Sequence, residues 1–187
     1  MKITKPKFLF LLLTTFVWTI SAVAQKVAGY SFDKYPVTEI YKGPKAKVNL
    51  KSSETAKGYR TTIKEQYKTS KIDFAGRYST VLWGAGTGLM VGAMVDNKTG
   101  IVYDLPLTEE NSYRGFCGNE ITNEDNTIYN KKSNLFITFT WSCEENKETK
   151  TNVITKYYSI FVWDETKKKF TLLKNKTEKK TEKIPTE

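Results

Sequence analysis

Apolar side chains recur every three to four positions over residues 52–71. This helical period places one set of side chains on a common face: Ala56, Tyr59, Ile63 and Tyr67. Ser52 or Ser53 offers an N-cap, and the acidic Glu54 stands in the first turn. The pattern predicts one amphipathic helix of about four turns, with Gly58 as its weak point.

From Tyr78 onward the apolar period changes to two, which is the period of a strand. Residues 78–83 (YSTVLW) form the first such run, and residues 89–95 (LMVGAMV) are apolar on both faces, as in a central strand. Residues 96–100 (DNKTG) combine Asp, Asn and Gly in a turn, and residues 101–106 (IVYDLP) return as a strand. We therefore predict a β-hairpin at this point of the chain.

The C-terminal half predicts further strands. Over residues 135–143 one face collects the alternate side chains Leu135, Ile137, Phe139, Trp141 and Cys143. Residues 153–174 then form a second hairpin, which turns near residues 164–166. Together these patterns predict a β-rich α+β fold: an antiparallel meander, built as a sheet, a sandwich or an open barrel, with the one amphipathic helix packed against it.

The N-terminus has the pattern of a secretory signal peptide. Lysines precede an apolar run of 13 residues, Phe8 to Ile20, and small residues follow up to Ala24. A membrane anchor is the alternative, but the run is shorter than the roughly 20 residues that span a bilayer. We therefore expect residues 1–24 to be cleaved, and the protein to be exported, periplasmic or extracellular, without stable membrane insertion.

The rest of the chain divides into three parts by composition. Residues 25–50 contain tyrosine, proline and glycine without a sustained period, and we expect an extended arm with one or two short edge strands. Residues 51–173 are expected to form a single β-rich domain. Residues 174–187 are almost devoid of apolar side chains and are expected to be a disordered charged tail.

The chain is basic, with a formal net charge of +10. A basic surface attracts nucleic acid, anionic lipid or acidic polysaccharide, and nucleic acid is the least available of these outside the cytoplasm. We therefore expect no nucleic-acid partner. Much of the charge lies in mixed Lys and Glu segments, where simple solvation is the alternative explanation.

Cysteine and histidine counts limit the chemistry. Cys117 and Cys143 are the two cysteines, and in an exported chain they are expected to form a disulfide, which would stabilise the fold by about 3.5 kcal/mol. The chain has no histidine, which excludes Ser-His-Asp and Cys-His catalysis and the common zinc sites. Carboxylate, serine–lysine or calcium chemistry is left, without a motif for any of them. No catalytic residue, metal site or cofactor is predicted.

Residues 74–106 resemble a family of uncharacterised secreted bacterial proteins with the pattern F-A-G-H-Y, W-G-C-G-T-x-C and D-x-K-T-G-x-V-Y. The positions of this motif in and around the glycine-rich elbow are Trp83, Gly84, Gly86, Thr87 and Gly88, which match the pattern, and Arg77, which stands at the position of its histidine. The resemblance implies the fold and export, and implies no reaction. Because a strand follows the glycines, we interpret the elbow as a turn and not as a phosphate-binding loop.

Three positions depart from the family pattern. Arg77 stands in place of its histidine, and Ala85 and Leu89 stand in place of its cysteines. The cysteines could have closed a small disulfide loop in relatives or, with the histidine, held a metal. Loss of all three together is what we expect if they acted as one unit in relatives.

The loop that contains Cys117 is the candidate recognition loop. Tyr113, Arg114 and Phe116 give it the aromatic and cationic mixture of a protein contact, although the loop could equally be inert. We therefore expect an exported, non-catalytic binding protein of the bacterial envelope that contacts a protein or an anionic glycan. The alternative is a carboxylate-based hydrolase acting on an envelope substrate, with its acids among Asp73, Asp96, Asp104 and Glu120. The identity of the partner and the oligomeric state are not predicted.

Overall fold

The computed structural model describes residues 26–86, 88–117, 120–121 and 126–183, with the backbone alone at 116–117 and 120–121. It confirms a β-rich α+β fold with antiparallel sheets. The helical segments are a 3₁₀ turn Phe32–Lys34, α1 Glu54–Gly58 and α2 Arg60–Thr69. The strands are β1 Lys26–Val27, β2 Tyr30–Ser31, β3 Tyr78–Gly84, β4 Met90–Asp96, β5 Val102–Asp104, β6 Phe116–Cys117, β7 Glu120–Ile121, β8 Thr127–Tyr129, β9 Leu135–Asn146, β10 Thr151–Asp164 and β11 Lys169–Lys183.

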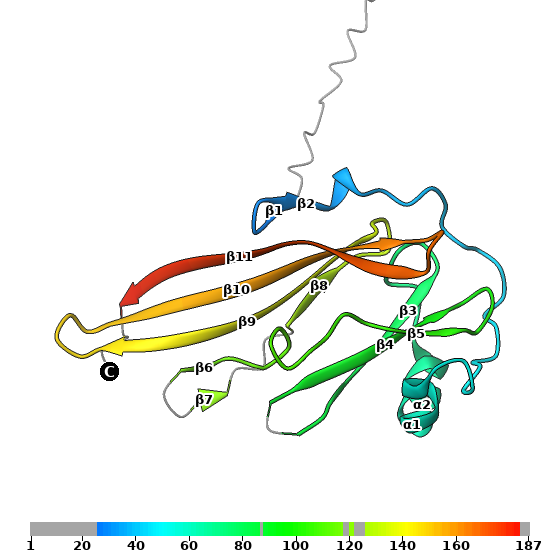
Figure 1. Cartoon of the computed structure of the whole chain (residues 1–187), viewed down its shortest axis with the longest axis horizontal. Coiled ribbons are helices and arrows are strands. Elements are labelled where there is room, and N and C mark those ends of the chain that lie inside the picture. The colour runs from blue at the N-terminus through cyan, green and yellow to red at the C-terminus, as the bar shows by residue number, and fades with distance from the viewer. Residues whose placement is uncertain (1–25, 87, 118–119, 122–125, 184–187) are drawn as a thin grey trace, which may run out of the picture.

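The elements form layers (Figure 1). The helices cover one face of the three-stranded sheet β3-β4-β5, and the other face of that sheet packs against the larger sheet. The larger sheet has the order β11-β10-β9-β6-β7, with β8 also paired to β9. Its outer face is covered by the hairpin β1–β2 and the 3₁₀ turn, through residues such as Phe32. Strands β9, β10 and β11 run well beyond the smaller sheet as a long arm.

The predicted helix is present but is broken near its weak point. Ser53 is the N-cap, and its hydroxyl accepts a 3.0 Å hydrogen bond from the Ala56 N–H. α1 ends at Gly58, because glycine pays a large entropy cost in a helix, and α2 begins at Arg60. The break leaves the side chain of Tyr59 43 % exposed, where the helical period predicted it on the buried face.

The first hairpin follows the prediction. β4 is the central strand of its sheet, paired with β3 on one side and β5 on the other. Alternate side chains point to opposite layers: Val81, Ala93, Val95 and Val102 pack under the helices, whereas Tyr78, Met94 and Leu105 pack against the larger sheet. A strand buried on both faces explains why residues 89–95 show no polar face.

Strand β9 differs from its predicted pattern. The first third, residues 135–138, is buried on both faces, and not on alternate positions alone. Leu135 and Ile137 face the N-terminal hairpin, and Phe136 faces the smaller sheet. Thr138 is also buried. Its hydroxyl donates a 2.7 Å hydrogen bond to the Asn111 carbonyl, which satisfies the polar group away from water. The covering by the N-terminal hairpin is a long-range feature that the local pattern does not contain.

The expected disordered tail is wrong for residues 174–183. These residues form the outer part of β11 and pair in register with β10, from Lys174 opposite Ile160 to Lys183 opposite Thr151. Polar side chains suit this part of the strand because most of them are exposed there, so no apolar face is needed. Backbone hydrogen bonds to β10 stabilise the segment instead. Residues 184–187 lie outside the described residues.

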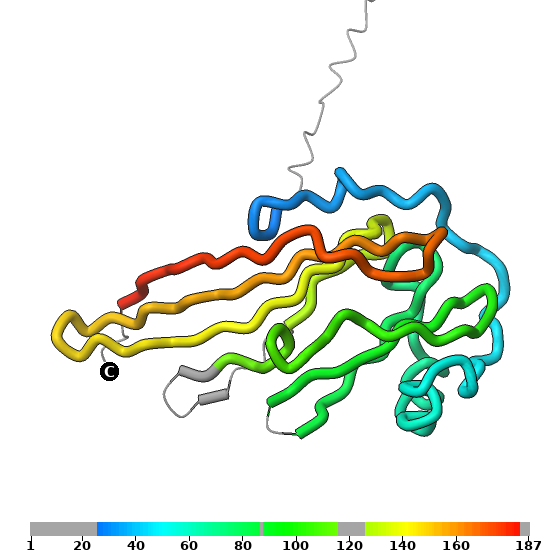
Figure 2. Tube along the Cα trace, in the orientation of Figure 1, coloured from blue at the N-terminus to red at the C-terminus, as the bar shows by residue number. Residues whose placement is uncertain are grey.

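The N-terminal segment crosses the molecule as an extended strap (Figure 2). Its backbone N–H groups donate to carbonyls on several turns: Val37 to Lys132, Tyr41 to Gly76, Ala46 to Asn97 and Asn49 to Gly100, at 2.8–3.0 Å. The predicted extended arm with edge strands agrees with this path. The expected signal peptide, residues 1–24, lies outside the described residues. No helix among residues 26–86, 88–117 and 126–183 is long and apolar enough to cross a membrane.

Candidate functional site

The glycine-rich elbow and the predicted recognition loop lie side by side. The Met90 N–H donates to the Ser112 carbonyl at 3.1 Å, Leu89 and Tyr113 form an isolated β-bridge, and the Arg114 N–H donates to the Gly88 carbonyl at 2.9 Å. The two segments were predicted separately and are more than 20 positions apart in the chain. We call residues 84–86, 88–90 and 111–115 together the elbow–loop surface.

The elbow itself is a tight turn between β3 and β4. Gly86 and Gly88 have φ angles of 92° and 83°, in the region that favours glycine. The Ala85 N–H donates to the Leu89 carbonyl at 2.8 Å and the Leu89 N–H donates to Gly86 at 2.9 Å. Thr87 lies outside the described residues. Backbone geometry therefore holds the elbow without the cysteines of the family pattern.

Long-range contacts fix the loop on the larger sheet. The Asn126 side-chain amide donates to the Tyr113 carbonyl at 2.5 Å. Gly115 lies directly against the indole of Trp141, so a Cβ added at Gly115 would come within 2.2 Å of the ring atoms. Such a contact admits no side chain at position 115 while the indole keeps its place.

The backbone also bears on the expected disulfide. Phe116 of β6 pairs in parallel with Ser142 of β9, so that Cys117 and Cys143 follow on neighbouring strands. Cys143 carries no free thiol. The side chains of Phe116 and Cys117 lie outside the described side chains, and the Cys117–Cys143 pairing stays a prediction.

Arg114 is the cationic side chain of the elbow–loop surface. It is half-buried, and its Nε atom is buried without a hydrogen-bond partner among the described residues. No described carboxylate forms an ion pair with its guanidinium. A buried donor without a partner costs about 1–3 kcal/mol, and more when it is charged. The ring of Trp83 packs on that of Tyr59, with 4.8 Å between the ring centroids. Its indole N–H is likewise buried and has no hydrogen-bond acceptor among the residues that the structure describes.

Arg77 does not belong to the elbow–loop surface. Tyr78 pairs with Asp96 at one end of the β3–β4 ladder, and Gly84 pairs with Met90 at the other. Six residues of strand separate the ends by about 20 Å. In this chain Ala85 and Leu89 face each other across the elbow, whereas Arg77 lies at the other end of the hairpin, and the interpretation of the three positions as one unit in relatives stays a prediction.

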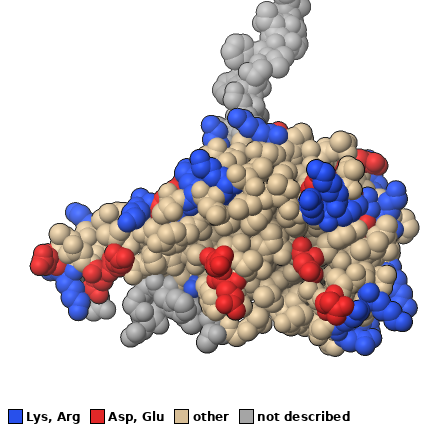
Figure 3. All heavy atoms as spheres, viewed as in Figure 1, with Lys and Arg blue, Asp and Glu red and all other residues tan. Residues whose placement is uncertain are grey.

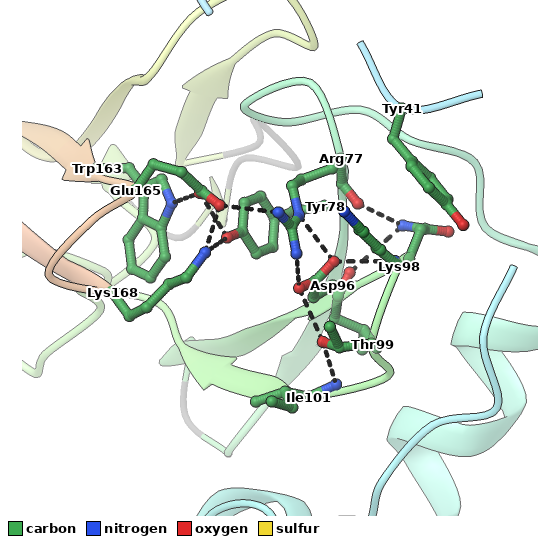
Figure 4. Close-up of polar contacts among 12 residues, drawn as sticks. Tyr41, Arg77, Tyr78, Asp96, Lys98, Thr99, Ile101, Trp163, Glu165 and Lys168 are labelled. Carbon is green, nitrogen blue, oxygen red and sulfur yellow. Dashed lines mark hydrogen bonds and ion pairs between the residues drawn. The ribbon is translucent and has the colours of Figure 1, made fainter. Parts of the chain in front are cut away.

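Arg77 is instead the centre of a charge network between two hairpin turns (Figure 4). Its Nε donates to Asp96 Oδ1 at 2.9 Å, a second nitrogen contacts Asp96 Oδ2, and Nη1 lies 3.1 Å from Glu165 Oε1. On the other side, Glu165 Oε2 accepts hydrogen bonds from the Tyr78 hydroxyl at 2.6 Å and from the Trp163 indole at 2.7 Å. Lys168 completes the network through Glu165 and Tyr78.

Asp96 also closes its own turn. Its carboxylate accepts from the Lys98 N–H at 2.9 Å and from the Thr99 hydroxyl at 2.8 Å, and only 1 % of the side chain is exposed. Burial by itself would raise the pKa of Asp96, but the hydrogen bonds from Arg77 and the turn outweigh burial and lower that pKa. Glu165 follows the same rule, and its pKa is also lowered. Burial, and then the hydrogen bond to Glu165, raises the pKa of Tyr78.

The four acids of the hydrolase alternative do not form a catalytic pair among the described side chains. Asp96 is tied to Arg77, and Asp104 is exposed on β5. Asp73 accepts hydrogen bonds from the Thr80 N–H and hydroxyl, at 2.9 and 2.7 Å; burial raises its pKa in spite of these bonds. The side chain of Glu120 is not described. The acids that do lie together are Asp96 and Glu165, and both are held as carboxylates by cations.

Sequence reasoning missed Glu165 and Lys168 as partners of Arg77. Arg77 and Glu165 are 88 positions apart, and no local pattern connects them. The available signal was the similarity of the two hairpin turns, each led by an aspartate. Asp164 does cap its turn, accepting from the Thr166 and Lys167 N–H groups at 3.0 and 2.9 Å.

Charge on the molecular surface is mixed. On the face in Figure 3, lysines and arginines lie in several separate groups with acidic side chains between them. Ion pairs such as Lys176–Glu178 and Lys180–Glu182 occur along β11. This face therefore favours recognition by particular residues over a continuous basic patch.

Comparison with known proteins adds no relative. No protein-family model matches the chain, and searches of curated proteins and of solved structures found no match either. The resemblance of residues 74–106 to the secreted bacterial family stays a prediction that rests on those residues.

Proposed function

We propose that this protein is an exported, non-catalytic binding protein of the bacterial envelope. The elbow–loop surface contacts a partner protein, and Arg114 meets an acidic group of that partner. An anionic glycan is the second class of partner that the sequence allows. The observation that carries the proposal is Arg114, a half-buried residue of this surface whose buried Nε atom has no hydrogen-bond partner among the described residues and whose guanidinium forms no ion pair with a described carboxylate.

Burial and charge explain why Arg114 is suited to this role. Buried polar groups are nearly always hydrogen-bonded, so an unpaired buried donor needs an explanation. The residue as a whole is partly exposed, so a partner carboxylate would form a charge-assisted hydrogen bond with the guanidinium without reaching the buried Nε atom, and such a bond is stronger than a neutral one. Arginine is also among the residues that dominate binding energy at protein interfaces.

The loop is rigid enough for recognition. Arg114 is held by the Gly88 carbonyl through its own N–H, Gly115 lies against Trp141, and Asn126 binds the carbonyl of Tyr113. A preorganised loop loses little conformational entropy on binding, which increases affinity. The hydrolase alternative has less support: the pKa of Asp73 is raised by burial, but no second described acid is seen to pair with it, and the two neighbouring acids, Asp96 and Glu165, have lowered pKa values.

The test is affinity capture from a solubilised envelope extract of the host. The chain, processed by the cell, is compared with Arg114→Gln and with Lys57→Gln, a matched charge removal on α1. We expect one stoichiometric protein that survives a high-salt wash with wild type and Lys57→Gln and is lost with Arg114→Gln. A hot-spot arginine of this kind contributes about 2 kcal/mol or more.

Two outcomes would contradict the proposal. Capture that is equal for all three chains would exclude Arg114 as the contact. Polyanions that elute at moderate salt from all three would reduce the interaction to general charge attraction.

A further inference from the structure

A pocket lies about 20 Å from the elbow–loop surface, at the opposite end of β3. The N-terminal strap, residues 37–43, forms one wall, and the turns that contain Arg77, Lys98 and Glu165 form the others. Figure 4 shows Tyr41, Arg77 and Lys98 gathered at this place. The volume of about 440 Å³ is in the range of small-molecule sites.

The walls of this pocket are fixed before any ligand arrives. The Tyr41 N–H donates to the Gly76 carbonyl at 2.8 Å, and the Val37 N–H donates to Lys132 at 3.0 Å. Gly76 has a φ of +75°, and a Cβ there would come within 2.2 Å of the Glu39 carbonyl oxygen. The strap is therefore seated closely on the turn and cannot slide without breaking these contacts.

The charged side chains at the base of the pocket are paired, whereas the cations at its rim are not paired with any described residue. At the base, Arg77 is already neutralised by Asp96 and Glu165. At the rim, Lys42 and Lys98 are exposed lining residues, and their ammonium groups make no hydrogen bond or ion pair with any described residue. These two cations are thus available to an acid group of a ligand.

The remaining lining groups suit hydroxyls and an apolar ring face. The Glu39 carboxylate accepts hydrogen bonds, Thr38 and Asn134 both donate and accept, and the ring of Tyr41 supplies an apolar wall. A simple anion such as phosphate would use the lysines but would be repelled by Glu39. A ligand with one acid group and several hydroxyls would use all of these residues.

We infer that this pocket binds a sugar acid, a hydroxylated ring that carries one carboxylate. Lys42 and Lys98 hold the carboxylate, Glu39 accepts from ring hydroxyls, and Tyr41 packs against the ring. The sugar acid is either a free monosaccharide or one unit of an anionic glycan. The site is independent of Arg114 and of the proposed protein partner.

The test is an NMR titration of the exported chain with glucuronate, with glucose and inorganic phosphate as separate probes. We expect a Kd of about 1 mM for glucuronate, as is usual for a ligand of this size, with amide shifts confined to residues 37–43, 75–77 and 97–100. Glucose and phosphate should each bind at least tenfold more weakly. Tighter binding of a glucuronate-containing oligosaccharide than of the monosaccharide would identify a glycan as the source, and equal binding would identify the free acid.

Variants separate this site from general charge effects. The pair Lys42→Ala and Lys98→Ala should weaken glucuronate binding about tenfold, whereas Lys57→Ala with Lys64→Ala, two exposed helix lysines, should leave it unchanged. Glu39→Gln should weaken glucuronate binding and strengthen phosphate binding. Equal binding of phosphate and glucuronate to wild type, no binding of glucuronate, or equal loss in both lysine pairs would overturn the inference. Arg114→Gln should not change the titration, so failure here and failure of the proposed function can be told apart.

Discussion

The guanidinium of Arg77 binds the carboxylate of Asp96 through two nitrogens, one of them at 2.9 Å, and so joins the residue before β3 to the last residue of β4. Asp96 is almost fully buried, and 24 % of the Arg77 side chain is exposed. The same guanidinium reaches Glu165 in the turn between β10 and β11. One side chain thus connects both sheets at the end of the molecule where three turns meet.

Removal of this cation should destabilise the fold in a pH-dependent way. Arg77→Met leaves Asp96 buried without a counter-charge and should cost about 3 kcal/mol at pH 7. In the wild type the pKa of Asp96 is lowered, so its contribution is present above the ordinary aspartate range and is lost as the pH falls through the lowered value. Urea unfolding at pH 7, 5 and 3 should therefore show a difference between the two proteins that shrinks on acidification.

The comparison with wild type isolates the Arg77 pair. Because the pKa of Asp73 is raised in the folded protein, this residue makes folding less favourable as the pH rises through the aspartate range. That effect is the same in both proteins and cancels in the comparison. Arg60→Met, on the exposed surface of α2, should change stability by less than about 0.5 kcal/mol at every pH. A stability difference for Arg77→Met that stays constant from pH 7 to 3 would contradict the assignment.

A side chain at Gly115 should displace the loop. Gly115→Ala places a Cβ against the Trp141 indole, and overpacking of this kind costs about 1–3 kcal/mol. We expect lower stability in urea and faster amide hydrogen exchange across residues 111–115. Gly84→Ala is the matched control, because no atom lies within 4 Å of a Cβ there. Equal effects of the two substitutions would show that the Trp141 contact is unimportant.

The first helical turn depends on its cap. Ser53→Ala removes the acceptor of the Ala56 N–H and should lower the free energy of unfolding by about 1 kcal/mol. Thr61→Ala, at an exposed position of α2, should leave stability unchanged or slightly higher, because alanine is the better helix former. The measurement is the urea midpoint of wild type and of both variants. An unchanged midpoint for Ser53→Ala would show that α1 contributes nothing to the cooperative unfolding unit.

The outer part of β11 should behave as a strand in solution. Amides of residues 174–183 that face β10 should be protected from hydrogen exchange, whereas a disordered tail would exchange within seconds. Deletion of residues 174–187 removes none of the buried core side chains, so stability should change little, while those amides of residues 151–160 in β10 that face β11 lose protection and those that face β9 keep it. Full exchange of the amides of residues 174–183 in the intact chain at the earliest time point would contradict the strand and support a disordered tail.

Local patterns were reliable where neighbouring residues decide the structure. The Ser53 cap, the helix weakness at Gly58 and the central position of β4 all follow from residues within a few positions of one another. The candidate sites were predictable only as separate segments. That the elbow and the recognition loop touch, through Gly88 and Arg114, was not visible in either segment alone.

The sequence by itself determined the fold class, the helix and the hairpins, because hydrophobic period and turn chemistry are local properties of a chain. Only the tertiary structure decided that Arg77 pairs with Asp96 and Glu165, that the N-terminal strap walls a pocket, and that residues 174–183 are a strand. These features depend on which distant segments satisfy one another's charges and backbone hydrogen bonds. Such pairing is a property of the packed chain, and it leaves no periodic trace in the order of residues.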